Sequence, residues 1–287
     1  MSLKCNLIDT SFSHHTSVGL PDTTVAGNFS EKIIWERDLS KQTDFCFFSN
    51  QKILERGKYN FSKKNCFGLL FESKSIIPDV FRISENVIPD FEMFFTHDSV
   101  LLSKFDNCFW IPGGGSWVGG QYAGGVRKIH NKTKLCSMVT STKRMCEMHN
   151  KRVDIANFLK MKNLADVFGL NNETQILSAA ATTDYMFNVC IENSIDDLYF
   201  TEKILNCFVT GTVPIYFGAR NISKIFDARG IIQFSEKEEL PKIISSLSPG
   251  LYLSMKNYIE KNFIESLKFL TIEDYIYENY LKQKYNL

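Results

Sequence analysis

Short apolar runs, separated by turn-rich polar stretches, dominate the first half of the chain. The runs "KCNLID", "TDFCFFSN", "NCFGLLFES", "FEMFFTHD" and "NCFWIP" have the length of strands, and several are apolar at nearly every position. Such runs are typical of strands that a sheet buries on both faces. The segments "NFSEKIIWERDL" and "SIIPDVFRIS" are expected to supply helices between them. The first half therefore predicts an α/β domain.

The second half restarts the alternation after the glycine-rich "PGGGSWVGGQYAGG" and the basic "VRKIHNKTK". Strands are expected at "LCSMVTS", "YMFNVCI", "TVPIYFG" and "GIIQF", and helices at "VDIANFLKM", "TEKILNCFV" and "NISKIF". This order predicts a parallel sheet with right-handed crossovers. From residue 248 onward apolar and aromatic residues recur on one face, which is typical of packed helices.

The restart, together with a length of 287 residues, predicts two domains of ordinary size. We expect an N-terminal acceptor-side domain over residues 1–133 and a C-terminal donor-binding domain with a helical tail over residues 134–287. Residues 127–134 would connect them. The glycine-rich stretch before this connection is open to a second interpretation, as an ordered loop in the cleft between the domains.

The composition excludes few classes of protein, but the net charge argues against two kinds of partner. The net charge of +1 gives no bulk attraction to nucleic acid or to an anionic membrane. The start "MSLKCNLIDTSF" lacks the apolar segment of a signal peptide, and no run is long enough to span a bilayer. We therefore expect a cytoplasmic protein with no integral membrane segment. The eight scattered cysteines read as small buried apolar residues, with a zinc site or disulfides as the less favoured interpretation.

Charge gathers in "ENSIDDLYFTEK", residues 192–203, directly after an apolar run. Thr201 is suited to cap the helix that follows, and Lys203 would lie in its first turn. A lysine there opposes the helix dipole by up to about 1 kcal/mol, which a bound anion would offset. A solvated helix start is the competing interpretation.

A second basic cluster lies in the loop expected between "LCSMVTS" and "VDIANFLKM". Its members are Lys143, Arg144, His149, Lys151 and Arg152. In a parallel sheet the two loops open on the same edge, and together they predict a diphosphate pocket. The chain has neither a G-x-x-x-x-G-K-[ST] loop nor an Asp-x-Asp pair, so arginine and lysine side chains would neutralise the phosphates without a metal ion.

The stretch "YMFNVCIENSIDDLYFTEKILNCFVTGTVPIYFG" resembles the donor-binding signature of the α1,3-fucosyltransferase family. That signature is an aromatic-rich strand, Glu-Asn, a variable loop, Tyr-x-Thr-Glu-Lys and Gly-Thr-x-Pro-Ile-Tyr-x-Gly. The resemblance implies the GT-B fold, in which two Rossmann-like α/β domains face a cleft. It also implies an inverting glycosyltransferase that needs no metal and no cofactor, with a nucleotide sugar such as GDP-fucose as donor and a glycan as acceptor.

The resemblance also assigns residues. It places Asn193, Tyr199 and Lys203 at the diphosphate and donor sugar, and Glu202 at the ribose hydroxyls. Arg152 would be the arginine that contacts the pyrophosphate. The family's general base is a glutamate that follows an apolar strand of the first domain, and "FGLLFES" offers Glu72. A capping or surface role is the alternative for that glutamate.

Other candidates remain open at this point. Glu85, Asp90 and Asp98 could replace the proposed base, and His97 follows a strand as well. The pair His14 and His15 could face the cleft, although nothing spaced like a metal ligand accompanies it. The aromatic residues around the glycine-rich stretch would stack on a sugar or pack the loop; they are Trp110, Trp117 and Tyr122.

Two other functions compete with sugar transfer. A methyltransferase or similar nucleotide-dependent enzyme could use "PGGGSWVGG" as a cofactor loop, although no strand and helix frame it in the required way. A non-catalytic carbohydrate-binding protein on the same scaffold would keep the cleft and lack the base.

Overall fold

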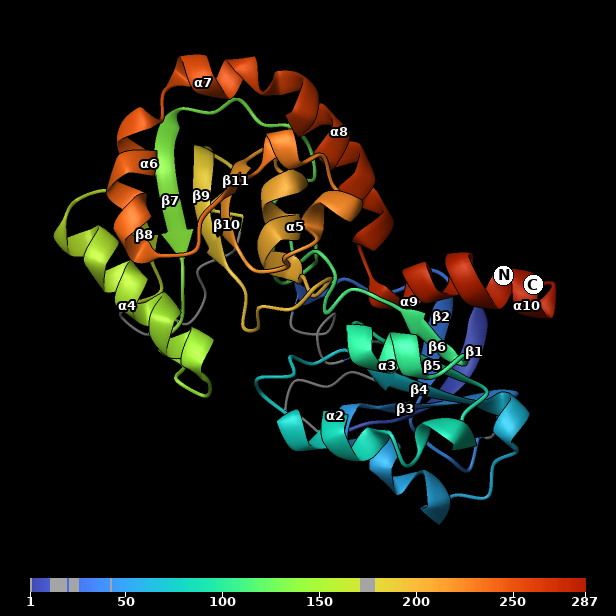
Figure 1. The fold of residues 1–287 in the computed structure, drawn as a ribbon. Helices are drawn as coiled ribbons and strands as arrows, with labels where there is room; N and C mark the ends of the chain where they lie inside the picture. Colours follow the sequence, from blue (N-terminus) through green and yellow to red (C-terminus); the bar gives the residue numbers. More distant parts are fainter. Residues whose placement is uncertain (1, 11–19, 21–25, 42, 171–178) are drawn as a thin grey trace.

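Two parallel β-sheets with flanking helices make up the computed structural model, which describes residues 2–10, 20, 26–41, 43–170 and 179–287. Figure 1 shows the sheets in separate halves of the molecule, one beside α4 and α6 and the other beside α2 and α3. Separate sheets in the two halves of the chain agree with the restart of the strand and helix alternation in the sequence.

The first sheet has six parallel strands in the order β2-β1-β3-β4-β5-β6. They are β1 (Leu3–Ile8), β2 (Ile33–Glu36), β3 (Phe45–Ser49), β4 (Cys66–Leu70), β5 (Met93–Thr96) and β6 (Cys108–Trp110). All five expected strands are present. The helix expected in "NFSEKIIWERDL" is wrong, because this segment forms β2 at the edge of the sheet. Ile33 and Trp35 are buried while Ile34 is exposed, and this period of two belongs to a strand.

The second sheet has five parallel strands in the order β11-β10-β9-β7-β8. They are β7 (Lys134–Val139), β8 (Asp166–Phe168), β9 (Tyr185–Ile191), β10 (Val213–Phe217) and β11 (Ile232–Gln233). The four expected strands are confirmed, and the short edge strand β8 was not foreseen. From β7 the chain runs to β8 on one side and returns to β9 on the other. The crevice between the carboxyl ends of β7 and β9 is therefore the topological switch point, where α/β sheets bind ligands.

Helices cover both sheets. In the first half these are η1 (Asn50–Lys58), η2 (Lys63–Asn65), α2 (Pro78–Ser84), η3 (Ile88–Asp90) and α3 (Ser99–Lys104). In the second half they are α4 (Glu147–Met161), α5 (Glu202–Phe208), η4 (Ile222–Lys224), η5 (Ala228–Gly230), η6 (Lys237–Glu239), α6 (Leu240–Ser246), α7 (Pro249–Ser254), α8 (Lys256–Ser266), η7 (Leu267–Phe269), α9 (Ile272–Ile276), η8 (Tyr277–Leu281) and α10 (Lys282–Tyr285). The segment "NISKIF" forms only the single 3₁₀ turn η4.

Helix α4 begins earlier than the sequence suggested. The stretch "TKRMCEMHNKR" was expected to be a loop, but its second half forms the first turns of α4. Glu147 complements the dipole of the helix start, and the inward face already begins at Met148. His149, Lys151 and Arg152 therefore lie on a helix and not on a loop.

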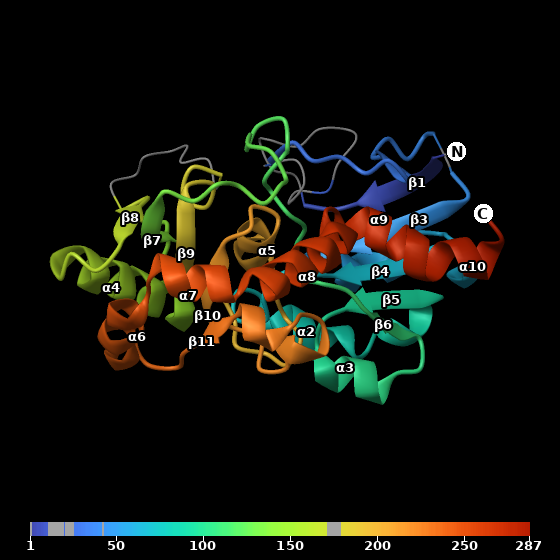
Figure 2. The same cartoon turned by 90° about the horizontal axis from the view of Figure 1, so that it is seen from above.

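The C-terminal tail returns to the first sheet. Ile272, Ile276 and Leu281 belong to the same apolar core as Phe47 and Phe95 of β3 and β5. Figure 2 shows α8 between the two halves, with α9 and α10 beside the first sheet. The sheets divide between β6 and β7, while the last helices complete the core of the first half. The boundary at residues 133/134 stays a prediction.

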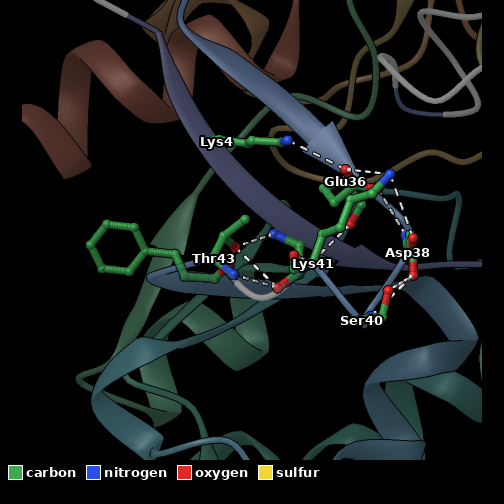
Figure 3. Close-up of polar contacts among 8 residues, drawn as sticks. Lys4, Glu36, Asp38, Ser40, Lys41 and Thr43 are labelled. Carbon is green, nitrogen blue, oxygen red and sulfur yellow. Dashed lines mark hydrogen bonds and ion pairs between the residues drawn. The ribbon is translucent and has the colours of Figure 1, made fainter.

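A polar network explains why Asn6 can be buried in strand β1. The amide nitrogen of Asn6 donates to the carbonyl oxygens of Glu36 and Lys41, both at 3.2 Å. Its amide oxygen accepts from the backbone nitrogen and hydroxyl of Thr43, at 3.0 and 3.1 Å. Figure 3 shows the surrounding ion pairs, in which the Glu36 carboxylate faces the ammonium groups of Lys4 and Lys41. Because the amide satisfies all its hydrogen bonds within the chain, the network fixes the β2–β3 connection.

Candidate active site

Arg152 spans the crevice between β7 and β9. It lies on α4, after β7, and its Nη1 donates at 2.8 Å to Oδ1 of Asn193, the second residue after β9. Its side chain is buried, and its Nε has no hydrogen-bond partner among the described residues. Burial lowers the pKa of Arg152, while the carboxylates of Glu202 and Glu192 oppose the shift. An arginine keeps its charge in proteins, so the switch point holds a cation with an unused donor.

Lys203 sits between two carboxylates at the start of α5. Its Nζ lies 2.9 Å from Oε1 of Glu202 and 3.7 Å from Oε2 of Glu192. Burial lowers its pKa, but the two carboxylates outweigh burial and the net shift is upward. Lys203 is therefore a partly buried ammonium group whose partners come from its own helix and from the end of β9.

Glu192 is the residue that sequence reasoning missed. Its side chain is fully buried, and its carboxylate accepts from the backbone nitrogen and the hydroxyl of Thr201, at 3.0 and 2.7 Å. Burial raises its pKa, with Lys203 opposing. The available signal was a glutamate at the end of a mostly apolar run, where a nearby cation and hydrogen bonds are needed to stabilise its charge.

The start of α5 has the form that the sequence predicted. The Thr201 side chain accepts from the backbone nitrogen of Lys203 and caps the helix. Ile204, Leu205 and Phe208 are buried below it, and Gly211 follows with a φ of 73°. The capped helix fixes Glu202 and Lys203 at the carboxyl edge of the second sheet.

The rest of the basic cluster contributes little to the crevice. Lys143 and Arg144 are exposed, and Arg144 contacts Asn150 on the surface of α4. Buried His149 accepts from the backbone nitrogen of Met145 at 3.1 Å. Burial, with the nearby Arg152 and Lys203, lowers its pKa to about 4, so the ring is neutral near pH 7. Arg152 is thus the member of the cluster whose charge is buried in the crevice.

Tyr199 joins the two halves of the molecule. Its side chain is buried, and its ring centroid lies 4.5 Å from that of His97, which follows β5. Its pKa is raised well above the ordinary value, chiefly by burial and then by the carboxylates of Glu192, Glu72 and Glu202. The tyrosine of the charged turn therefore lies against the end of the first sheet.

The glycine-rich stretch is an ordered loop that packs on the charged turn and α5. A Cβ atom on Gly113 would lie 2.3 Å from Cε2 of Tyr199, so the approach requires glycine. Oδ1 of Asn206 in α5 accepts from the backbone nitrogens of Trp117 and Val118, at 2.9 and 3.2 Å. The Trp110 ring packs against Phe200, Phe269 and Tyr275, whereas Tyr122 is exposed.

Glu72 follows β4 at the carboxyl edge of the first sheet and is partly exposed. Its backbone nitrogen donates to Oδ1 of Asn50 at 3.1 Å, and its carbonyl oxygen lies 3.0 Å from Nε2 of His97. Its carboxylate accepts from the backbone nitrogen of Ser73 at 2.8 Å. The hydroxyl of Ser75, three residues further on, lies 3.1 Å from that of Ser194, so the segment that follows Glu72 contacts the charged turn of the second half.

The alternative bases either have structural partners or lie at the other edge of the sheet. Asp98 caps α3 by accepting from the backbone nitrogen of Leu101, and it pairs with Lys74 at 2.6 Å. Glu85 pairs with Lys104, the last residue of α3. Asp90 precedes β5 and lies at the opposite, amino edge of the sheet. His14 and His15 lie outside the described residues.

Cysteines and metal ligands add no further centre to the described part of the chain. All eight cysteines are free thiols, and seven of them are buried. Across the described ranges, no group of three or more His, Cys, Asp or Glu side chains could hold a metal ion. No described helix has the length and apolar character to cross a membrane.

Comparison with known proteins gives a family for the second half. Residues 129–259 match glycosyltransferase family 10 (fucosyltransferase), C-terminal part. The chain is 26% identical over 112 residues to an α-(1,3)-fucosyltransferase of Helicobacter pylori, and 28% over 134 residues to α-(1,3)-fucosyltransferase C of Drosophila melanogaster. These alignments cover 39% and 43% of this chain, and 22% and 31% of the relatives. The chain thus spans less than a third of the curated relatives that it matches.

Solved structures extend the likeness in fold to the whole chain. An α1,3-fucosyltransferase structure superposes with a TM-score of 0.55 at 14% identity, over 93% of this chain and 88% of the other. T4 phage BGT in complex with UDP-glucose superposes with a TM-score of 0.53 at 12% identity, over 99% of this chain and 100% of the other. These similarities confirm the expected GT-B fold. The second half of the chain is thus similar in sequence to the fucosyltransferases of glycosyltransferase family 10.

Proposed function

We propose that this protein is an inverting, metal-independent glycosyltransferase that moves a sugar from a nucleoside diphosphate donor to a hydroxyl group of a glycan. The observation that carries the proposal is the buried Arg152, whose Nε is unused, beside Lys203 in the stretch that matches family 10. GDP-fucose is the first candidate donor, because solved α1,3-fucosyltransferases of the same fold bind GDP and GDP-fucose.

Arg152 and Lys203 would neutralise the leaving diphosphate. The bond from Arg152 to Asn193 holds the guanidinium in place and leaves Nε for a phosphate oxygen. Charge-assisted bonds of this kind are the strong ones in proteins. Lys203 would exchange part of its contact with Glu202 for the phosphate, which frees Glu202 to accept from the ribose hydroxyls.

Glu72 would act as the general base. Its carboxylate is partly exposed, so an acceptor hydroxyl can reach it from the cleft. It removes the proton as the hydroxyl oxygen attacks the anomeric carbon, and the bond to the diphosphate breaks on the opposite face. One displacement of this kind inverts the anomeric configuration.

Titration calorimetry with GDP in the presence of EDTA tests the donor side. We expect binding without a metal ion, followed by turnover of at least one sugar in a panel of nucleotide sugars. The anomeric configuration of the product, read by NMR, tests the single displacement. Strict dependence on magnesium or manganese, or retention of configuration, would contradict the mechanism.

The same titration separates the competing functions. Binding of S-adenosylmethionine would favour a methyltransferase, and binding of free sugar without nucleotide would favour a carbohydrate-binding protein. None of the reported comparisons supports either function, since all of them are with glycosyltransferases.

A further inference from the structure

His97 touches both halves of the candidate site. It follows β5 in "FFTHD", and its side chain is completely buried. Its Nε2 lies 3.0 Å from the carbonyl oxygen of Glu72, and its ring packs against Tyr199 of the charged turn. Phe81 of α2 lies on the ring as well, with centroids 5.4 Å apart. The imidazole therefore lies between Glu72, the proposed base, and Tyr199 of the charged turn.

The contact with Glu72 fixes the proton on the ring. A carbonyl oxygen can only accept, so Nε2 of His97 carries the hydrogen. Nδ1 is buried with no hydrogen-bond partner among the described residues, and a second proton there would be an unsatisfied buried donor. Burial lowers the pKa of His97; the hydrogen bond to Glu72 and the carboxylates of Asp196 and Asp98 oppose this, and Lys74 adds to it. The ring is therefore neutral, with a single donor directed at Glu72.

The backbone around Glu72 is held from two sides. Oδ1 of Asn50 accepts from the backbone nitrogens of Phe71 and Glu72, at 3.2 and 3.1 Å. His97 holds the carbonyl oxygen of the same residue. The chain leaves β4 here, and these side chains supply the hydrogen bonds that the sheet no longer provides.

Direct proton transfer by His97 does not fit this geometry. The side chain exposes no surface, so an acceptor hydroxyl cannot reach Nδ1. Nε2 is already engaged with the carbonyl oxygen of Glu72. The role left to the ring is to hold other groups in place.

We propose that His97 is a positioning residue, which fixes the backbone of Glu72 against the Tyr199 ring so that the base faces the bound donor. This inference rests on the proposed function. Misplacing a reacting group by about 1 Å costs on the order of a hundredfold in rate. Loss of the hydrogen-bond donor at Nε2 of His97 should therefore lower kcat and leave the affinity for the nucleotide unchanged.

Two substitutions at His97 separate the hydrogen bond from the packing. His97→Phe keeps an aromatic ring against Tyr199 but removes the donor to Glu72. His97→Gln places an amide nitrogen near the former Nε2 and retains a donor. His130→Phe is the matched control, because Nε2 of His130 also bonds a carbonyl oxygen, that of Val126 at 2.8 Å, on the exposed connection before β7.

The full-length variants are assayed for kcat and KM with the nucleotide sugar that the wild type turns over, for GDP affinity by calorimetry and for melting temperature. We expect His97→Phe to lose about 10- to 100-fold in kcat, with KM for the donor and the Kd for GDP within about twofold of the wild type. His97→Gln should recover most of kcat, and His130→Phe should match the wild type. If His97→Phe does not fold, His97→Met takes its place as the variant without a hydrogen-bond donor.

Each other outcome is decisive. A folded His97→Phe with wild-type kcat, a loss confined to KM for the donor, or equal damage from Phe and Gln at similar melting temperatures overturns the positioning role. A wild type that neither binds GDP nor turns over any nucleotide sugar removes the proposed function, and the inference with it. An active wild type with an equally active His97→Phe removes the inference alone.

Discussion

The two sheet edges that meet at the site are built in opposite ways. At the edge of the second sheet, Arg152, Glu192, Glu202 and Lys203 place two positive and two negative groups close together, and all are at least partly buried. At the edge of the first sheet, Glu72 is held through its backbone by neutral side chains. Charged side chains organise the second edge, which suits an anionic ligand. At the first edge, neutral side chains fix the position of Glu72, which suits a proton transfer.

This difference predicts which kinetic quantity each edge controls. Charges that contact a diphosphate change donor affinity, and they do so more weakly as salt increases. A base that meets only the acceptor hydroxyl changes the rate of the chemical step. Substitutions at the two edges should therefore give separate signatures in Kd and kcat.

The largest effect is expected from Glu72→Gln. Glutamine keeps an oxygen for the backbone nitrogen of Ser73 but cannot take the acceptor proton, so kcat should fall by about two to four orders of magnitude. GDP affinity should stay near the wild-type value. Release of GDP from the donor measures kcat, and calorimetry measures the affinity.

Glu85→Gln is the control for this change, because it removes a carboxylate that pairs with Lys104 on α3. Its kcat should equal that of the wild type. Near-normal turnover by a folded Glu72→Gln variant would move the base to another residue, with Asp98 the next to test.

Arg152→Ala tests the charged edge. It removes the cation at the switch point and leaves Asn193, Glu192 and Glu202 without that partner, so GDP binding should weaken by about 2–3 kcal/mol. Calorimetry at low and high salt measures this loss.

Lys151→Ala is the matched control on the same helix. Lys151 is partly exposed and bonds Ser235 and Glu236 outside the crevice, so GDP binding should hardly change. Equal GDP affinities for the wild type and Arg152→Ala would show that the diphosphate binds elsewhere.

Gly113→Ala tests the contact between the glycine-rich loop and Tyr199, where the two edges meet. The added Cβ would meet the Tyr199 ring, which cannot retreat because His97 packs on it. Overpacking of this kind costs about 1–3 kcal/mol, measured as a lower free energy of unfolding in denaturant. Gly57→Ala is the control, since a Cβ there meets nothing within 4 Å. Equal stability of the two variants would mean that the loop shifts freely.

The sequence predicted the charged edge better than the other. The turn from Asn193 to Lys203 is one continuous stretch, so its motif and its geometry coincide. The base edge is assembled from Asn50, Glu72 and His97, which come from three strand ends, and their spacing in the chain says nothing about their contacts. Glu192 was missed because burial gives it its role, and burial depends on packing that the motif does not encode.

Some predictions of element type and boundary were wrong for similar reasons. The sequence around β2 resembles a helix because charged residues flank a strand of only four residues. Its pairing at the edge of the sheet makes this segment a strand. The basic stretch at residues 142–152 resembles a loop because most of its residues are polar, although Met148, His149 and Arg152 form part of the inward face of α4. The return of α9 and α10 to the first sheet depends on contacts between the two ends of the chain, which local periodicity does not report.

The smallest effect is expected at Asp227, an outer carboxylate of the second half. It pairs with Arg229 at 2.7 Å, and hydrogen bonds from this arginine lower its pKa to about 2. A lowered pKa stabilises the fold above the ordinary value near 4, and this contribution is lost as the pH falls toward 2. Because the pair is close to solvent, Asp227→Asn should cost less than about 1 kcal/mol at pH 7.

Unfolding in denaturant at several pH values measures this contribution. The wild type and Asp227→Asn should differ slightly at pH 7 and converge as the pH approaches 2. A pH-independent difference could not come from ionisation of Asp227 and would contradict the role of the ion pair. A small difference at pH 7 that disappears near pH 2 would show that the ion pair of Asp227 and Arg229 contributes little, so the larger losses expected at Arg152 arise from burial of charge in the crevice.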